Sequence, residues 1–134
     1  MSRILQPTEH EIQSAIVRWA ELQSGKHPEL RMLFAIPNGG WRHMTTAAKL
    51  KAEGVRPGVP DLFLACPRYC GAVWAAGLFM EVKRGTMGRV REQQALWAGA
   101  LAARGYCVRV VRSTDEGIAC LKEYLNIRDN QKPQ

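Results

Sequence analysis

The stretch from residue 54 to residue 83 constrains the fold more than any other part of this sequence. Asp61 follows a turn rich in glycine and proline and opens one short apolar run, and Glu81 and Lys83 close the next apolar run. Side chains of a β-strand alternate between its two faces, so Glu81 and Lys83 should share one face while Val82 points into the core. If the two runs pair as neighbouring strands, Asp61 lies close to Glu81. The stretch therefore predicts a sheet that gathers two carboxylates and a lysine at one place.

These three charged side chains are the parts needed to hydrolyse a phosphodiester. Two carboxylates that lie close together repel each other unless a cation sits between them, and hard oxygen ligands suit Mg²⁺ or Mn²⁺. The ammonium of Lys83 beside such an ion would polarise an attacking water or stabilise a phosphate. The alternatives are a turn aspartate at position 61 and a surface ion pair between Glu81 and Lys83, worth about 0.5 kcal/mol. The metal interpretation is favoured because a charged pair inside an apparently central strand is costly without a cation or a function.

The charge balance of the chain points to a polyanionic partner. Its 134 residues contain 19 Lys and Arg against 12 Asp and Glu, which gives a net charge of +7. Nucleic acid is the commonest partner of such a basic protein, although a solvated basic surface would have the same composition. The length is typical of one domain, and we expect residues 1–134 to form one, with a core at about residues 8–125 and a polar tail at 126–134.

The cysteines and the hydropathy pattern indicate a cytoplasmic protein. The four cysteines do not show the paired spacing of a zinc site, and they are predicted to be reduced and structural. The sequence begins without the apolar region of a signal peptide, and no apolar run reaches membrane-spanning length. The cysteines lie at positions 66, 70, 107 and 120.

The periodicity predicts an α/β protein with a mixed central sheet flanked by helices. Thr8 and Glu11 form a capping-box pattern at the start of the first helix. Residues 72–77 are expected to extend one of the two neighbouring strands as a hairpin arm, and the helix at 90–104 is expected to contribute several apolar side chains to the core. The predicted order is helix 8–25, buried strand 31–37, helix 45–52, strands 62–65 and 78–83, helix 90–104, strand 106–111 and helix 113–125.

The same charged residues belong to a longer pattern that resembles a known family. Pro-Asp followed by Glu-x-Lys is the signature of restriction-endonuclease-like nucleases, and more of the chain is similar to one branch, the virus-type replication-repair nuclease (VRR-NUC) domain. The resemblance implies a restriction-endonuclease-like core. The matching pieces are Glu11, Pro37-Asn38-Gly39-Gly40, Gly54 to Leu62, Glu81-Val82-Lys83, Gln94 with Trp97, and Gly105-Tyr106 before Val108.

The resemblance also implies roles for residues outside the charged trio. Glu11 would be a third acid at the metal, although its capping position gives it a structural alternative. The Val82 carbonyl would be a further ligand beside Asp61 and Glu81. Gln94 would face the active site and orient a water or the lysine, with the adjacent Gln93 as the alternative if the register is shifted.

Five residues with amide or cationic side chains are predicted to contact DNA, four in loops beside the expected site and Lys49 on the exposed part of the helix at 45–52. The glycine turn after Pro37 would let backbone approach a phosphate, and the basic loop after Lys83 lies next to the site. The predicted DNA contacts are Asn38, Arg42, Lys49, Arg84 and Arg89.

These expectations combine into a Mg²⁺- or Mn²⁺-dependent endonuclease. The family resemblance implies cleavage of branched DNA, such as four-way (Holliday) junctions, by a homodimer of phage or bacterial type. The alternatives are a flap nuclease or exonuclease, a nuclease that cuts duplex DNA, and a nucleic-acid-binding module without catalysis. The last of these would not need Asp61, Glu81 and Lys83 together, because acids near phosphate oppose binding in the absence of a metal.

Overall fold

A four-stranded mixed sheet forms the centre of the protein. The computed structural model describes residues 5–37, 44–86 and 88–129. The strand order is β1-β2-β5-β6, in which β2 pairs antiparallel with both β1 and β5, and β6 runs parallel to β5. This arrangement is the predicted mixed sheet of an α/β protein. The strands are β1 (Leu33–Ala35), β2 (Leu62–Leu64), β5 (Leu78–Val82) and β6 (Cys107–Val111).

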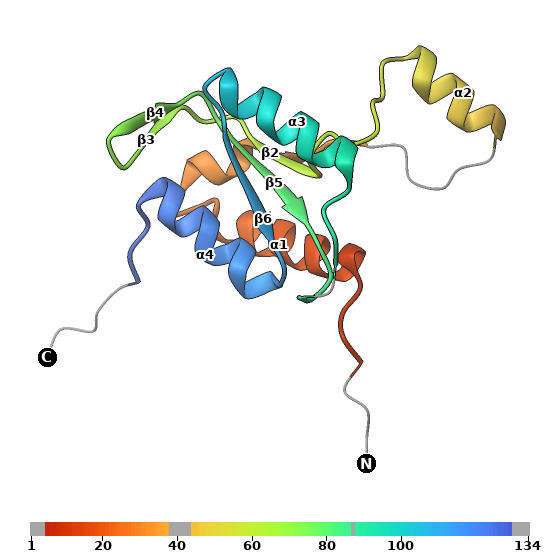
Figure 1. Ribbon diagram of the computed structural model, residues 1–134. Coiled ribbons are helices and arrows are strands. Elements are labelled where there is room, and N and C mark those ends of the chain that lie inside the picture. The colour runs from red at the N-terminus through yellow and green to blue at the C-terminus, as the bar shows by residue number, and fades with distance from the viewer. Residues whose placement is uncertain (1–4, 38–43, 87, 130–134) are drawn as a thin grey trace, which may run out of the picture.

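Helices cover both faces of this sheet (Figure 1). The helices α1 (Glu9–Gln23) and α4 (Thr114–Leu125) pack together on one face, and α3 (Glu92–Ala103) lies on the other. The core lies between the sheet and the first two helices, because alternate residues of β2 and β5 point that way. Its completely buried side chains include Ile12, Ile16, Leu62, Leu64, Leu78, Met80, Val82 and Leu121.

The opposite face of the sheet carries aromatic residues and then charged ones. The Phe63 and Phe79 rings stack with their centroids 4.3 Å apart, and Tyr106 meets Phe79 edge-on at 5.2 Å. Asp61 precedes Phe63 by two residues and Glu81 follows Phe79 by two, so the period of two places both acids on this face. The face covered by α3 is therefore the one that carries the candidate site.

Two elements project from the central body. The helix α2 (Met44–Ala52) stands apart from the sheet, and none of its described side chains, at residues 46–52, is buried. The strands β3 (Arg68–Cys70) and β4 (Val73–Ala75) form a separate two-stranded hairpin. Residues 72–77 were expected to extend one of the two neighbouring strands as a hairpin arm. A hairpin arm is present, but its residues 73–75 pair with residues 68–70 in a sheet of their own, because Gly71 turns the chain back with a φ of +65°.

Two sequence-based predictions about burial were wrong. The first strand was expected to be buried, but β1 is a short edge strand in which Phe34 is 49% exposed, since a 3₁₀ helix (Pro28–Met32) takes the preceding residues. The α3 helix was expected to supply core residues, yet the described part of the chain shows no buried residue in it. Its apolar residues surround the helix, so the sequence pattern defines no single inward stripe.

The predicted polar tail is partly attached to the body. Asn126 ends α4 in the left-handed conformation, and Ile127 packs against the core. Lys122 binds Asp129 at 2.7 Å, while residues 130–134 lie outside the described residues. None of the described helices combines the length and the apolar character that a membrane crossing requires.

Candidate active site

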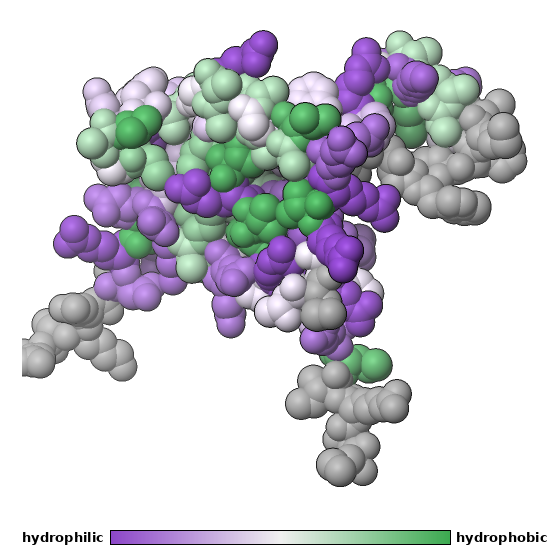
Figure 2. All heavy atoms as spheres, in the orientation of Figure 1, coloured by the Kyte–Doolittle hydropathy of each residue, from purple (hydrophilic) through white to green (hydrophobic). Residues whose placement is uncertain are grey.

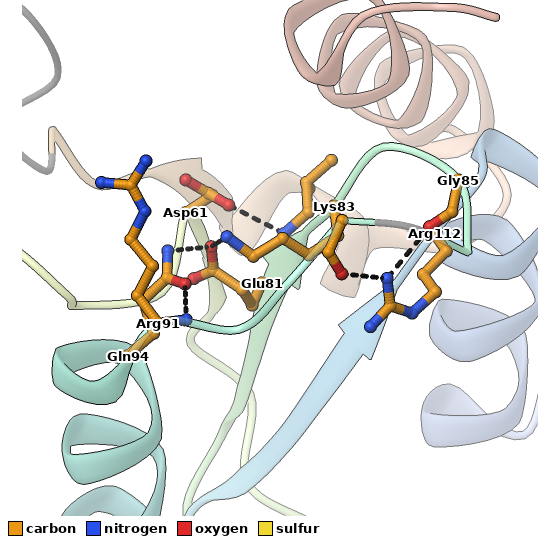
Figure 3. A network of polar contacts seen from close by, with 9 residues as sticks. Asp61, Glu81, Lys83, Gly85, Arg91, Gln94 and Arg112 are labelled. Atoms are coloured by element: carbon orange, nitrogen blue, oxygen red, sulfur yellow. Dashed lines mark hydrogen bonds and ion pairs between the residues drawn. The ribbon is translucent and has the colours of Figure 1, made fainter.

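The pairing of β2 with β5 brings the two predicted carboxylates together. Leu62 lies opposite Met80 in the antiparallel register, so Asp61 falls beside Glu81 at the next position. The Val82 amide N–H donates a hydrogen bond to Asp61 Oδ2 at 2.7 Å, which fixes the aspartate against the backbone of β5 (Figure 3). The predicted role of the Val82 carbonyl as a ligand stays a prediction.

Glu81 is a buried carboxyl in the middle of the sheet. Only 5% of the residue is exposed. Its Oε1 accepts a hydrogen bond from Gln94 Nε2 at 2.9 Å and lies 3.5 Å from Lys83 Nζ. Its Oε2 is also buried and has no hydrogen-bond partner among the described residues. Burial, reinforced by the neighbouring charge of Asp61 and only partly offset by Lys83, raises the pKa of Glu81 to about 8.

Lys83 lies on the same side of the strand as Glu81 and is 6% exposed. Its backbone N–H donates to the Val111 carbonyl at 2.9 Å, which continues the pairing of β5 with β6 beyond the last residue of β5. The chain direction at Lys83 is therefore set by the sheet. The ammonium is held beside a carboxylate and is largely removed from water.

Gln94 connects the start of α3 to Glu81. Its Oε1 accepts a hydrogen bond from the Arg91 backbone N–H at 2.9 Å, while its Nε2 donates to Glu81. The two bonds fix which end of the amide faces the carboxyl. Gln94, rather than Gln93, contacts Glu81, and the Gln93 backbone carbonyl instead lies against Gly58.

A cavity of about 650 Å³ opens over these residues. Its wall carries three acids and three bases, together with two glutamines and part of the loop before β2. The lining residues are Glu9, Pro57, Gly58, Asp61, Glu81, Lys83, Arg89, Arg91, Gln93 and Gln94.

The first helix contributes Glu9 to this cavity, and Glu11 is not among the lining residues. The Glu11 carboxylate accepts hydrogen bonds from the Thr8 backbone N–H at 3.3 Å and from its hydroxyl at 3.1 Å, and the Glu11 N–H donates to Thr8 Oγ1. Its capping role is thus present, and its role as a ligand remains a prediction. Sequence reasoning missed Glu9 because both acids lie in the same helical turn.

The donors at the site suit a small divalent cation. No group of three or more His, Cys, Asp and Glu residues in the described parts of the chain is arranged to hold a metal ion. Mg²⁺, however, is commonly bound through one or two carboxylates, with waters and substrate phosphates completing its shell. Asp61 and Glu81 supply that pair, and the unsatisfied Oε2 of Glu81 needs either a proton or a cation.

The comparisons with known proteins agree with this geometry. A family model described as "VRR-NUC domain" matches residues 2–115. The chain belongs to the VRR-NUC family. A solved structure titled "VRR_NUC domain protein" superposes with a TM-score of 0.75 at 28% sequence identity, covering 93% of both chains. No curated protein matches the sequence.

These matches confirm the predicted VRR-NUC family and its restriction-endonuclease-like fold. The family implies a nuclease that acts on DNA. The Pro-Asp and Glu-x-Lys elements of the VRR-NUC pattern are the residues that the sheet brings together at the base of the cavity.

The residues predicted to contact DNA do not all lie at the cavity. Arg89 lines the cavity. Arg84 is exposed and donates to the Gln6 carbonyl at 3.2 Å, and Lys49 is exposed on α2. Asn38 and Arg42 lie outside the described residues. Arg91, which the sequence analysis did not single out, lies beside Arg89 on the cavity wall because it immediately precedes α3.

Proposed function

We propose that this protein is a Mg²⁺- or Mn²⁺-dependent endonuclease that hydrolyses phosphodiester bonds of branched DNA, such as four-way junctions. The observation that carries the proposal is the paired arrangement of Asp61 and Glu81, with a buried, unsatisfied carboxylate oxygen and with Lys83 3.5 Å from the same carboxyl. A nucleic-acid-binding module would gain nothing from two acids at the base of this cavity, because acids near phosphate oppose binding in the absence of a metal. A phosphodiester hydrolase needs them.

Asp61 and Glu81 would hold the ion, which when bound supplies Lewis-acid activation of water and offsets negative charge on the phosphate. Glu81 must release its proton before it can bind the ion, because its raised pKa keeps the carboxyl protonated at neutral pH. Gln94 keeps the Glu81 carboxyl in place through its Nε2–H. Lys83 stabilises negative charge next to that carboxyl, and the guanidinium groups of Arg89 and Arg91 at the cavity wall bind neighbouring phosphates.

The exposed apolar surface of α3 supports a homodimer. Leu96 is 66% exposed, and a groove of about 430 Å³ follows the helix. Figure 2 shows green, apolar side chains over the region of α3. The groove is lined by Leu96, Trp97, Ala100, Leu101 and Arg104. A twofold contact along this surface would cover the apolar groups and would present two active sites to one DNA molecule, as paired cuts across a junction require.

Cleavage of labelled four-way junction, flap, duplex and single-stranded DNA, each with Mg²⁺, Mn²⁺ or EDTA, tests the proposal. We expect paired cuts in the junction that depend on the metal and disappear in Asp61→Asn and Lys83→Ala. Lys26→Ala, an exposed lysine just beyond α1, is the matched control and should cut normally. Preferred cutting of flaps or of duplex would keep the chemistry and exclude the junction assignment. DNA binding without cutting in the presence of either metal would refute the proposal that the protein is a nuclease.

Sedimentation of Leu96→Glu tests the dimer. A charge in the apolar groove should convert the protein to a monomer and should uncouple the two cuts in a junction while single nicks persist. An unchanged sedimenting mass would exclude the α3 surface as the interface.

A further inference from the structure

The described residues that follow Lys83, at positions 84–86 and 88, turn back toward the base of the lysine side chain. The Gly88 N–H donates to the Arg84 carbonyl at 3.2 Å. A Cβ atom placed on Gly88 would lie 2.9 Å from the Arg84 carbonyl oxygen and 3.3 Å from Lys83 Cβ. The backbone at Gly88 therefore lies close to the Cβ atom of Lys83, and this approach helps to explain why only 6% of Lys83 is exposed.

Arg112 holds this loop in place from the neighbouring strand (Figure 3). Its Nη1 donates to the Gly85 carbonyl at 2.9 Å and to the Gly88 carbonyl at 2.5 Å. Arg112 directly follows Val111, whose carbonyl accepts the hydrogen bond from the Lys83 backbone. Arg112 is thus the neighbour of the residue that pairs with Lys83. From there its side chain binds the carbonyls of Gly85 and Gly88.

Arg112 is itself fixed at its backbone. Its N–H donates to Glu116 Oε2 at 2.5 Å, and the Glu116 N–H donates to the N-cap Ser113 at 3.1 Å. The start of α4 therefore anchors the arginine.

The loop needs such an anchor because glycine is costly to order. Gly85 adopts a φ of +56°, which glycine reaches easily, and glycine loses more conformational freedom on folding than any other residue. Two carbonyl contacts from one half-buried charged group are hydrogen bonds of the stronger kind. Removing them would leave the turn free to open locally while the sheet stays folded.

We propose that Arg112 is a positioning residue for Lys83, acting through the loop at Gly85 and Gly88 that shields the lysine and keeps its ammonium beside Glu81. The catalytic consequence rests on the nuclease function proposed above. The shielding itself does not, because the contacts that produce it lie entirely within this chain.

Reactivity of individual lysines measures the shielding without reference to activity. Brief acetylation of the full-length protein, followed by peptide mass spectrometry, should show Lys83 modified about tenfold faster in Arg112→Ala than in the wild type, as expected if the turn opens more often. Lys26 and Lys122 should be unchanged. Arg112→Lys, which keeps one cationic donor, should give an intermediate rate at Lys83.

Arg68→Ala is the matched control. Arg68 is also a partly buried arginine whose guanidinium donates to a backbone carbonyl, that of Leu125 at 3.1 Å, but it lies on the β3–β4 hairpin away from the cavity. Its loss should leave Lys83 protected. Equal acetylation rates of Lys83 in Arg112→Ala and in the wild type would overturn the proposal. Equal acetylation rates of Lys83 in Arg112→Ala and in Arg68→Ala would overturn it as well.

Cleavage kinetics then test the catalytic consequence. Arg112→Ala should lower kcat about tenfold with little change in KM, whereas Arg68→Ala should leave kcat unchanged. A lower kcat in Arg112→Ala without faster acetylation of Lys83 would refute action through Lys83. A wild-type protein that cuts no DNA would refute the proposed function, whereas the acetylation result would still decide the role of Arg112.

Discussion

Replacing Glu81 with glutamine should stabilise the metal-free protein at pH 8 while abolishing cleavage. The pKa of Glu81 is about 8, against 4.5 for an ordinary glutamate, chiefly because the carboxyl is buried. The folded protein therefore holds this proton more tightly than the unfolded chain does. Its contribution to stability is complete below about pH 4.5 and is lost as the pH rises through about 8. Glutamine has the same shape and does not ionise.

The size of the effect follows from these two pKa values. At 1.36 kcal/mol for each pKa unit, ionisation of Glu81 should remove about 2 kcal/mol of unfolding free energy between pH 6 and pH 8. For a chain of this length that corresponds to a fall in Tm of about 6 °C. Glu81→Gln should remove this part of the pH dependence. The difference in unfolding free energy between Glu81→Gln and the wild type should therefore grow as the pH rises.

Urea unfolding in EDTA at pH 6, 7 and 8 is the direct assay. Glu92→Gln, an exposed acid at the start of α3, is the control and should keep the wild-type pH dependence. Added Mg²⁺ should stabilise the wild type more at pH 8 than at pH 6, since binding at Glu81 must displace its proton, and should not stabilise Glu81→Gln in this manner. Parallel pH dependences for the wild type and Glu81→Gln would refute the reasoning.

Three further substitutions test the local packing. Gly58→Ala should lower the unfolding free energy, measured by urea titration, by about 1–3 kcal/mol and should also slow cleavage. The backbone at Gly58 has a φ of +95°, and a Cβ there would lie 2.8 Å from the Gln93 carbonyl oxygen. Gly117→Ala should cost a similar amount in thermal denaturation, since its Cβ would collide with the Ile16 side chain, but activity per folded molecule should persist. Thr8→Ala should cost about 1 kcal/mol through loss of the helix cap, measured by urea unfolding monitored by circular dichroism.

The sheet and its paired acids could be predicted because they depend on local patterns. Pro60 precedes Asp61, and the period of two along β5 separates Val82 from Glu81 and Lys83, so the faces follow once the strands are recognised. The register of β2 with β5 then follows from burying the apolar side chains. The family resemblance added the position of Gln94, which periodicity alone left open.

The remaining parts depend on contacts between distant segments. Nothing in the sequence says whether Glu9 or Glu11 lines the cavity, because both lie in the first turn of α1 and the choice depends on where the helix meets the sheet. The contact of Arg112 with Gly85 joins residues 27 positions apart. The exposure of α3 was hidden because an apolar composition all around a helix usually indicates burial.

The register that builds the core also builds the active site, so stability and activity are coupled through the pairing of β2 with β5. Leu62 and Met80 face α1 and α4, while Asp61 and Glu81, one residue away along each strand, face the cavity. A slip of one residue would move an acid into the core and a large apolar side chain into the cavity. The buried charges weaken the very sheet that positions them, and the apolar face of the same strands must offset that cost. Selection for a correctly paired core therefore also maintains the geometry of the acids, and the site requires no separate device to bring them together.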